Sequence, residues 1–457
     1  MPPISVSAVS APAYLRLIGA CAALACAAWA AGAPAATSGP AGPARVALDE
    51  NGVTVVDGRK LFPVGFTMPP PPDGRTPAGV DAYAELRAAG GTFIRTGPWL
   101  GESWDEPFIE KERRFQDAAA RAGLLCLPWL KELSGVEPGN ADQEAKLRRV
   151  VNLFKDHPGL GCWKGADEPE WGKEPVEPLE RAKRIIGQLD PNHPVWIVHA
   201  PRGTVESLRR YNNTMDILGL DIYPVSYPPG AHSLLPNREI SLVGDHAQII
   251  MEVARGRAPR PLPVWMTLQI AWSGVAKEGR TLRFPTAHDE RFMAYQAVIN
   301  GARGLIFFGG HLPNTLTPED RALGWNWRFW ERALKSVVQE LGDKSPLHPA
   351  LVAPASTLPV KCKLPGVPHV QYKGVELLVR EVGDDIFLFA CKREGDTVHV
   401  EFSDLPPVEP AAEVMFESPR KVVIENGKFT DWFGPFDVHV YKLKRTGPNP
   451  TTKRARE

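Results

Sequence analysis

Neither sign of charge is in excess in this sequence, which has 53 Lys and Arg residues, 53 Asp and Glu residues and a formal net charge of zero at pH 7. Proteins that hold the phosphate backbone of nucleic acids usually carry a basic excess. The short basic stretch at residues 453–456 is more simply a solvated chain end. The composition therefore predicts no nucleic-acid partner, and its 43% hydrophobic and 23% charged residues are typical of a globular protein.

Cysteine is scarce, and the motifs of cofactor enzymes are missing. Of six Cys, two lie in the first 30 residues, and the others are Cys126, Cys162, Cys362 and Cys391. No Cys-x-x-Cys pair or Cys/His spacing suggests a structural zinc site, although a Cys362–Cys391 disulfide is left open. No Gly-x-Gly-x-x-Gly opens a helix after the first strand, and there is no nucleotide phosphate loop or Gly-x-Ser-x-Gly elbow. We therefore expect no metal, no cofactor and no serine-hydrolase chemistry.

The first 36 residues have the pattern of an export signal. Arg16 precedes an apolar run at residues 17–29, and small residues with a cleavage box at 33–35 follow. Because the run is short for a membrane span, we predict a signal peptide over residues 1–36, a linker over 37–45 and no membrane span in the mature protein. Export to the periplasm or the outside is expected; the alternatives are an uncleaved anchor or a lipid on Cys21 or Cys26.

From residue 46 onward, short apolar runs alternate with amphipathic stretches, which is the pattern of repeated βα units. A lead-in hairpin with an Asp57-Gly58 turn comes first. The eight predicted strands are Leu61–Phe66, Thr92–Thr96, Leu124–Trp129, Leu160–Lys164, Val195–His199, Ile217–Tyr223, Val264–Leu268 and Gly304–Phe308. Eight such units predict a (β/α)8 TIM barrel over residues 46–345.

The periodicity changes after residue 341. Short alternating strands and turn signals such as Glu394-Gly395-Asp396 predict an all-β sandwich domain over residues 350–445. Residues 446–457 are expected to be a disordered tail.

Polar or aromatic side chains follow nearly every predicted strand. These residues are Arg95, Trp129, Glu168, His199, Asp221, Tyr223, Gln269 and His311. The carboxyl ends of the strands form the catalytic face of this fold, so we expect these side chains to converge on one cleft.

The sharpest local signal is Ala166-Asp167-Glu168-Pro169, directly after the fourth strand. Here the chain resembles the superfamily of (β/α)8 glycoside hydrolases whose acid/base follows strand four and whose nucleophile follows strand seven. The resemblance implies that Glu168 is the acid/base, that Arg95 supports the nucleophile and that Tyr223 lies in the active site. The alternative for Glu168 is a residue of a capping turn at the start of the next helix.

The seventh strand departs from the family, because Gln269 stands where the catalytic Glu is expected. An amide cannot form the covalent intermediate of a retaining double displacement. Three possibilities remain: Asp221 as the base of an inverting reaction, Asp167 and Glu168 acting together on a substrate that supplies its own nucleophile, or binding without cleavage. An unrecognised nucleophile, such as Glu132 or Glu252, is a further alternative.

A carbohydrate is the expected substrate, because Trp rings stack on sugar rings while polar groups bond to hydroxyls. The residues predicted to bind it are Arg95, Trp99, Trp129, Lys164, His199, Tyr223, Gln269, Trp272 and His311. Trp325 and Trp327 are interpreted either as subsite residues or as packing residues. The competing functions are a non-catalytic carbohydrate-binding barrel and a polysaccharide lyase that uses Tyr223 and His199 in a basic cleft with Lys131, Lys164 and Arg95. A carboxyl separation of ~5 Å would indicate retention, and ~6.5–9.5 Å would indicate inversion.

Overall fold

The computed structural model describes residues 42–257, 259–271, 283–364 and 374–447, so the predicted signal peptide lies outside the described residues. The described chain begins with an antiparallel sheet of β1 (Val46–Leu48), β2 (Thr54–Val56) and β3 (Arg59–Leu61). Asp57 and Gly58 form the turn between β2 and β3 with φ of 48° and 80°, the left-handed conformation that such a hairpin turn needs. Val46 packs with Trp196 and Trp265 from inside the barrel, so this small sheet covers one end of it.

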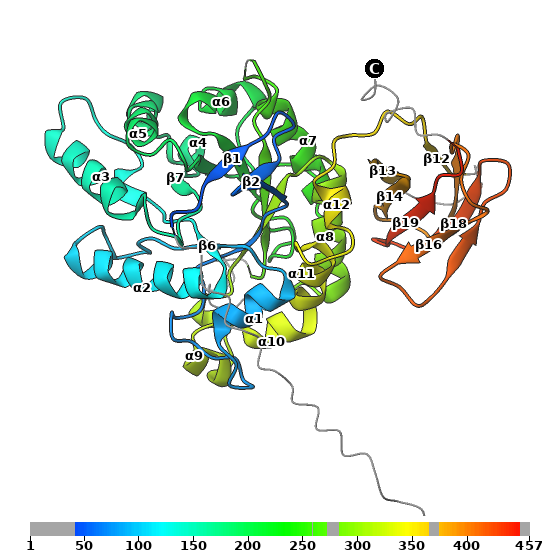
Figure 1. Cartoon of the computed structure of the whole chain (residues 1–457), viewed down its shortest axis with the longest axis horizontal. Coiled ribbons are helices and arrows are strands. Elements are labelled where there is room, and N and C mark those ends of the chain that lie inside the picture. Colours follow the sequence, from blue (N-terminus) through cyan, green and yellow to red (C-terminus); the bar gives the residue numbers. More distant parts are fainter. Residues whose placement is uncertain (1–41, 258, 272–282, 365–373, 448–457) are drawn as a thin grey trace, which may run out of the picture. The chain divides into compact units, whose positions relative to one another are not determined.

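Eight parallel strands make up the central sheet (Figure 1). They are β4 (Val64–Thr67), β5 (Phe93–Arg95), β6 (Leu125–Cys126), β7 (Trp163–Asp167), β8 (Val195–His199), β9 (Ile217–Asp221), β10 (Val264–Gln269) and β11 (Gly304–Phe308). Their order is β6-β5-β4-β11-β10-β9-β8-β7. The circle is closed by backbone hydrogen bonds from Lys164 N to Pro128 O (3.0 Å) and from Leu130 N to Lys164 O (2.8 Å). The predicted (β/α)8 barrel is therefore confirmed.

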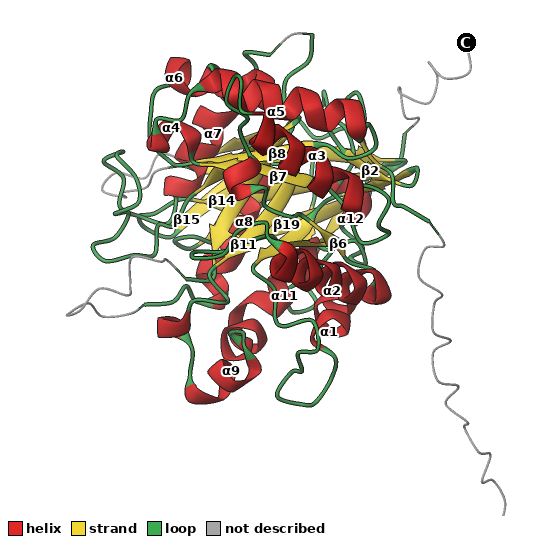
Figure 2. Ribbon diagram, turned by 90° about the vertical axis from the view of Figure 1, so that its left-hand side faces the viewer, coloured by secondary structure: helices red, strands yellow, loops and turns green. Residues whose placement is uncertain are grey.

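Helices form the layer outside the strands (Figure 2). They are α1 (Ala82–Ala89), α2 (Glu106–Ala122), α3 (Ala141–Phe154), α4 (Pro169–Gly172), α5 (Val176–Leu189), α6 (Val205–Arg209), α7 (Leu242–Ala254), α8 (Ala287–Ile299), α9 (Pro318–Leu323), α10 (Trp327–Phe329), α11 (Lys335–Leu341) and α12 (His348–Leu351). Short 3-10 turns lie at Lys131–Leu133, Asn212–Thr214 and Pro313–Thr315, and a π-helical turn lies at Trp330–Leu334. Local sequence sets the ends: Asp105 caps the amide of Phe108 at the start of α2, and Gly123 ends that helix with φ of 77°. Among the described residues, no helix is long and apolar enough to cross a membrane.

Two predicted strands, Val195–His199 and Gly304–Phe308, have the predicted bounds. The fourth strand runs from Trp163 to Asp167 rather than from Leu160 to Lys164. The reason is a register irregularity between Lys164 and Asp167 against β8, which carries the strand past Lys164 toward Glu168. The predicted bounds therefore lie too close to the amino terminus at the strand that leads into Glu168.

The carboxyl-terminal region is built from two antiparallel sheets, as the predicted β-sandwich requires. One contains β12 (Lys361–Lys363), β15 (Val398–Ser403) and β18 (Phe429–Phe433), and the other contains β13 (Val375–Val382), β14 (Asp385–Lys392), β16 (Ala411–Met415), β17 (Lys421–Val423) and β19 (Val438–Lys444). Their buried faces share one apolar cluster that includes Leu388, Phe402 and Tyr441. Cys362 and Cys391 are both free thiols, so the disulfide left open from the sequence is not formed.

The aromatic segment after β11 packs between β4 and the helices outside the barrel strands. Trp325, Trp327 and Trp330 are fully buried. The rings of Trp325 and Trp330 lie 5.8 and 5.7 Å from the ring of Phe66 on β4, both edge-on. Of the two interpretations of Trp325 and Trp327, the structure supports packing.

Candidate active site

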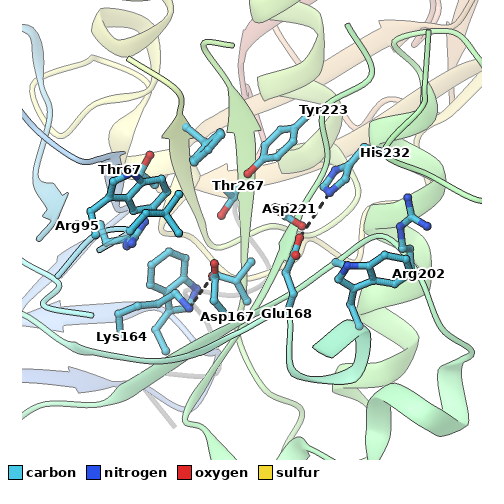
Figure 3. A pocket seen from close by; sticks show the side chains of 17 residues that line it. Thr67, Arg95, Lys164, Asp167, Glu168, Arg202, Asp221, Tyr223, His232 and Thr267 are labelled. Carbon is cyan, nitrogen blue, oxygen red and sulfur yellow. Dashed lines mark ion pairs between the residues drawn. The ribbon is translucent and has the colours of Figure 1, made fainter. Parts of the chain in front are cut away.

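A cavity of about 370 Å³ opens at the carboxyl ends of the barrel strands (Figure 3). Seven of the eight strands contribute lining residues: Thr67 from β4, Arg95 from β5, Lys164 and Asp167 from β7, Val198 from β8, Asp221 from β9, Thr267 from β10 and Phe308 from β11. Loop residues complete the wall: Trp99, Leu100, Glu168, Trp171, Ala200, Arg202, Tyr223 and His232. The cavity is large enough for a small ligand and lies where barrel enzymes hold theirs.

Glu168 follows β7 directly and has an unusual backbone. Its φ of 52° and ψ of 46° are left-handed, a conformation that is costly for a side chain with a Cβ atom. The amide of Glu168 donates to Val198 O at 2.7 Å, which holds this turn against β8. The side chain makes no capping hydrogen bond to α4, so the alternative of a capping role is not supported. Instead the carboxyl group points into the cavity (Figure 3).

The carboxyl of Asp221, the last residue of β9, meets that of Glu168. One carboxylate oxygen of Glu168, one of Asp221 and one ring nitrogen of His232 all lie within 4.8 Å of one another. The distance from His232 Nε2 to Glu168 Oε1 is 3.5 Å. Burial, the negative charges of Glu168 and Asp167 and the hydrogen bond to Glu168 raise the pKa of Asp221 well above its ordinary value. Two adjacent carboxyls repel each other when both are ionised, and this repulsion favours the protonated form of Asp221.

Asp167 has the opposite electrostatic environment. Its Oδ1 lies 2.9 Å from Nζ of the buried Lys164, and Lys164 also donates to the backbone oxygen of Ala166 at 2.6 Å. Burial acts to raise the pKa of Asp167, but the charges of Lys164 and Arg95 outweigh it and leave the pKa below its ordinary value. The cavity therefore contains one carboxyl whose pKa is raised and one whose pKa is lowered, and such a divergence is how acid and charge-stabilising roles are divided in hydrolytic sites.

Arg95 is 3% exposed, and its guanidinium lies beside two neighbouring indole rings. Its guanidinium carbon is 5.1 Å from the Trp99 ring and 4.7 Å from the Trp129 ring. Nε and Nη2 of Arg95 have no hydrogen-bond partner among the described residues. The hydroxyls of Thr67 and Thr267 and Oδ1 of Asp221 are likewise without a partner in the described chain. Buried polar groups are normally satisfied, so this concentration indicates a place for a polar ligand.

Searches with the sequence find no matching family model and no matching curated protein. Solved structures do match. A glycoside hydrolase aligns with a TM-score of 0.56 and 14% identity over 89% of this chain and 98% of that one. A family 5 glycoside hydrolase from Bacteroides vulgatus aligns with a TM-score of 0.60 and 14% identity over 89% and 94%. An alpha-amylase from Geobacillus thermoleovorans aligns with a TM-score of 0.53 and 12% identity over 84% and 99%.

The fold is that of the (β/α)8-barrel glycoside hydrolases. At 12–14% identity the alignments establish the architecture, and the chemistry has to be argued from the side chains of this chain.

Seven of the residues predicted from the sequence line the cavity: Arg95, Trp99, Lys164, Asp167, Glu168, Asp221 and Tyr223. Tyr223 is sandwiched between two rings, with His232 at 4.7 Å and Phe308 at 5.1 Å. Trp272 lies outside the described residues.

Four other predicted residues lie away from the cavity lining. The Gln269 amide is fully buried, accepts from Val225 N at 2.8 Å and donates to Val225 O at 2.8 Å, so it fastens the loop after β9. His199 packs against Tyr211 at 5.5 Å, and His311 stands edge-on to Trp99 at 4.8 Å. The Trp129 ring packs against the guanidinium of Arg95, whose carbon lies 4.7 Å from the ring centroid. None of these four side chains lines the cavity, and their contact with substrate stays a prediction.

The two alternative nucleophiles are also placed elsewhere. Glu132 Oε1 accepts from Trp104 N at 2.7 Å, while Glu252 lies on α7 and pairs with Arg209 and Arg255. Neither is part of the cavity wall.

Ten of the 17 lining residues were not among the predicted site residues, and three of them are instructive. Thr267 lies two residues before Gln269 on β10, so strand alternation could have found it. Trp171 lies three residues after Glu168, on the short helix α4, and its ring is covered by Arg202 at 4.0 Å. His232 comes from the long loop between β9 and α7, and no local pattern marks it.

Proposed function

We propose that this protein is an exported hydrolase that cleaves a glycosidic bond of an oligo- or polysaccharide. The observation that carries the proposal is the contact between the Glu168 and Asp221 carboxyls inside a cavity at the carboxyl ends of the barrel strands. Glycosidic cleavage needs a proton donor for the leaving oxygen, and the raised pKa of Asp221 favours a proton within this pair.

We assign the proton donor to Glu168, because it lies nearer the mouth of the cavity. The side chain of Glu168 is 28% exposed, whereas Asp221 is 6% exposed at the end of its strand. Asp221 then keeps the shared proton available to Glu168. The leaving oxygen departs with the proton of Glu168, and Glu168 then takes a proton from water as the water oxygen bonds to the anomeric carbon, which restores the pair.

Asp167 is proposed as the carboxylate that stabilises positive charge at the anomeric carbon. It stays ionised because of Lys164, and an ionised carboxylate bound to an ammonium group is a weak nucleophile but still an effective source of negative potential. This division differs from the hypothesis in which Asp167 and Glu168 act on a substrate that supplies its own nucleophile, because here water attacks and Asp167 stabilises charge.

The separation of the carboxyls argues against Asp221 as the base of an inverting reaction. Inversion needs ~6.5–9.5 Å between the two carboxyls to admit water, whereas oxygens of Glu168 and Asp221 lie within 4.8 Å. A lyase mechanism is also disfavoured: burial and the Asp221 charge raise the pKa of Tyr223 well above its ordinary value, and His199 is not part of the cavity wall.

Aryl glycosides of graded leaving-group acidity test the role of Glu168. A set of sugars is first screened with wild type as 2,4-dinitrophenyl and phenyl glycosides. On the phenyl glycoside, Glu168→Gln is expected to lower kcat about 10²–10⁴-fold, because general acid catalysis typically supplies that factor. On the dinitrophenyl glycoside the loss is expected to be at least tenfold smaller, because that leaving group departs without a proton.

Asp167→Asn is the matched comparison and is expected to slow both substrates equally. Unchanged phenyl glycoside turnover in Glu168→Gln would contradict the assignment. Sugar binding without any turnover by wild type would favour the alternative of a binding barrel, which the tethered Gln269 at the expected nucleophile position supports.

A further inference from the structure

The uncompensated cation in the cavity is Arg95. Only 3% of its surface is exposed, and its Nε and Nη2 atoms find no acceptor in the described part of the chain. A buried guanidinium without an anionic partner is costly, because desolvation of the charge is not offset by hydrogen bonds. In the resting protein the charge of Asp167 and the faces of Trp99 and Trp129 offset part of that cost.

The nearest carboxylate does not satisfy Arg95. Asp167 acts on Arg95 through its charge, but its Oδ1 is bound to Lys164 at 2.9 Å. Figure 3 shows Asp167 between Arg95 and Glu168 in the view drawn. Lys164 therefore neutralises Asp167, and Arg95 remains in excess.

Two guanidinium groups of the cavity wall lack a carboxylate partner. Glu168 and Asp221 face each other, and their mutual repulsion disfavours a full negative charge on both. Arg202 stacks on Trp171 and has no ion-pair partner among the described residues. With Arg95, it makes this wall attractive to anions.

We infer that the sugar bound in this cavity carries an oxyanion, a carboxylate or a sulfate ester, which pairs with the guanidinium of Arg95. The inference rests on the proposed function for the identity of the ligand as a sugar. An Arg fork can donate two parallel hydrogen bonds to either oxyanion. Because stacking contacts rather than acceptors hold the guanidinium, it can turn toward an entering oxyanion without losing a hydrogen bond.

The arrangement also gives the oxyanion a position relative to the chemistry. Arg95 ends β5, and Glu168 follows β7, so the two groups meet the sugar from different walls. The anion would lie on the Trp99 side while the scissile oxygen faces Glu168. The Arg95 pairing would therefore orient the ring as well as hold it, which is the usual role of an Arg clamp.

Binding of matched methyl glycosides tests the inference independently of turnover. Glu168→Gln protein is titrated by NMR with methyl glucuronide, galacturonide and mannuronide, with their 6-O-sulfated counterparts, and with the neutral glucoside, galactoside and mannoside. At least one acidic glycoside is expected to bind tenfold or more tightly than its neutral partner, since charge-assisted hydrogen bonds are worth roughly that factor. Preference for the uronide or for the sulfate identifies the oxyanion.

Three further variants in the same background locate the preference. Arg95→Gln is expected to abolish it, and Arg95→Lys to keep only part of it, because Lys retains the charge without the planar fork. Arg114→Gln on the outer face of α2 is the control and is expected to keep the full preference, because the Arg114 side chain is 62% exposed.

Equal binding of acidic and neutral glycosides, no binding of any acidic one, or a preference that survives Arg95→Gln would each overturn the inference. The outcome is separable from hydrolysis. Cleavage of neutral glycosides without acidic preference would leave the proposed function standing and remove the anion site. An Arg95-dependent preference in a protein that cleaves no glycoside would support the anion site and contradict the proposed function.

Discussion

Two buried aspartates at opposite ends of the barrel have contrasting environments. Asp190, in the loop before β8, is 2% exposed and accepts from Trp163 Nε1 at 2.8 Å and Asn192 N at 3.1 Å, with His193 Nδ1 at 2.8 Å. Asp221, at the end of β9, is 6% exposed and faces another carboxyl, with Oδ1 unpartnered. The first carboxylate is surrounded by donors and stabilises the fold. The second has the Tyr223 hydroxyl as a hydrogen-bond partner and a carboxyl neighbour that raises its pKa, which is a poor arrangement for stability and a useful one for proton transfer.

The largest expected effect is at Asp190. Asp190→Ala should lower the free energy of unfolding by about 3 kcal/mol, because it leaves buried donors of Trp163, Asn192 and His193 without an acceptor. Urea unfolding measures the loss, and kcat per folded molecule should stay unchanged. Asp73→Ala, at an exposed position, is the control. A variant as stable as wild type would show that the Asp190 network contributes little.

Asp221→Asn should raise the free energy of unfolding, and the size of this increase should depend on pH. Because the folded-state pKa of Asp221 is raised, the folded carboxyl keeps its proton while the unfolded one ionises above about pH 3.9. The stability contributed by the protonated carboxyl is thus complete below that pH and is lost as pH rises through the folded-state pKa.

The Asn variant has no such loss. It should equal wild type near pH 4 and exceed it by about 1 kcal/mol or more at pH 7, while hydrolysis falls sharply. Unfolding curves at the two pH values check this. A constant difference between the two proteins at both pH values would mean that Asp221 does not hold a proton in the folded state.

The smallest expected change in the free energy of unfolding concerns two arginines, one with carboxylate acceptors and one without. Arg87 forms two hydrogen bonds with Asp343, at 2.8 and 2.6 Å, whereas Arg95 has no acceptor for Nε and Nη2. Arg95→Met should raise the free energy of unfolding by about 1 kcal/mol, because an uncompensated buried charge is removed. Arg87→Met should lower it by about 0.5 kcal/mol. Thermal unfolding of both variants is the measurement, and a loss of stability in Arg95→Met would contradict the interpretation of Arg95 as uncompensated.

The eight-strand architecture could be predicted from sequence because apolar runs and polar segments alternate regularly. Val195–His199 and Gly304–Phe308 were located to the residue. The fourth strand was misplaced because its bulge after Lys164 is a tertiary irregularity against β8 that hydrophobic periodicity does not record.

The candidate site was predictable in part. Residues at strand ends converge in any such barrel, which found Arg95, Glu168 and Asp221. Sequence could not distinguish a strand-end side chain that faces the cavity from one captured by a neighbouring loop, as Gln269 is by Val225. Nor could it find His232, which reaches Glu168 from a loop with no periodic pattern.

The left-handed backbone of Glu168 has an evolutionary consequence. A Glu at φ of 52° costs free energy that Gly would avoid and that Asn would reduce. In a gene copy released from selection for chemistry, substitution at this position should therefore drift toward Gly or Asn, because those residues relax the turn. Retention of Glu at this position across diverged copies would mark those in which the carboxyl is still in use.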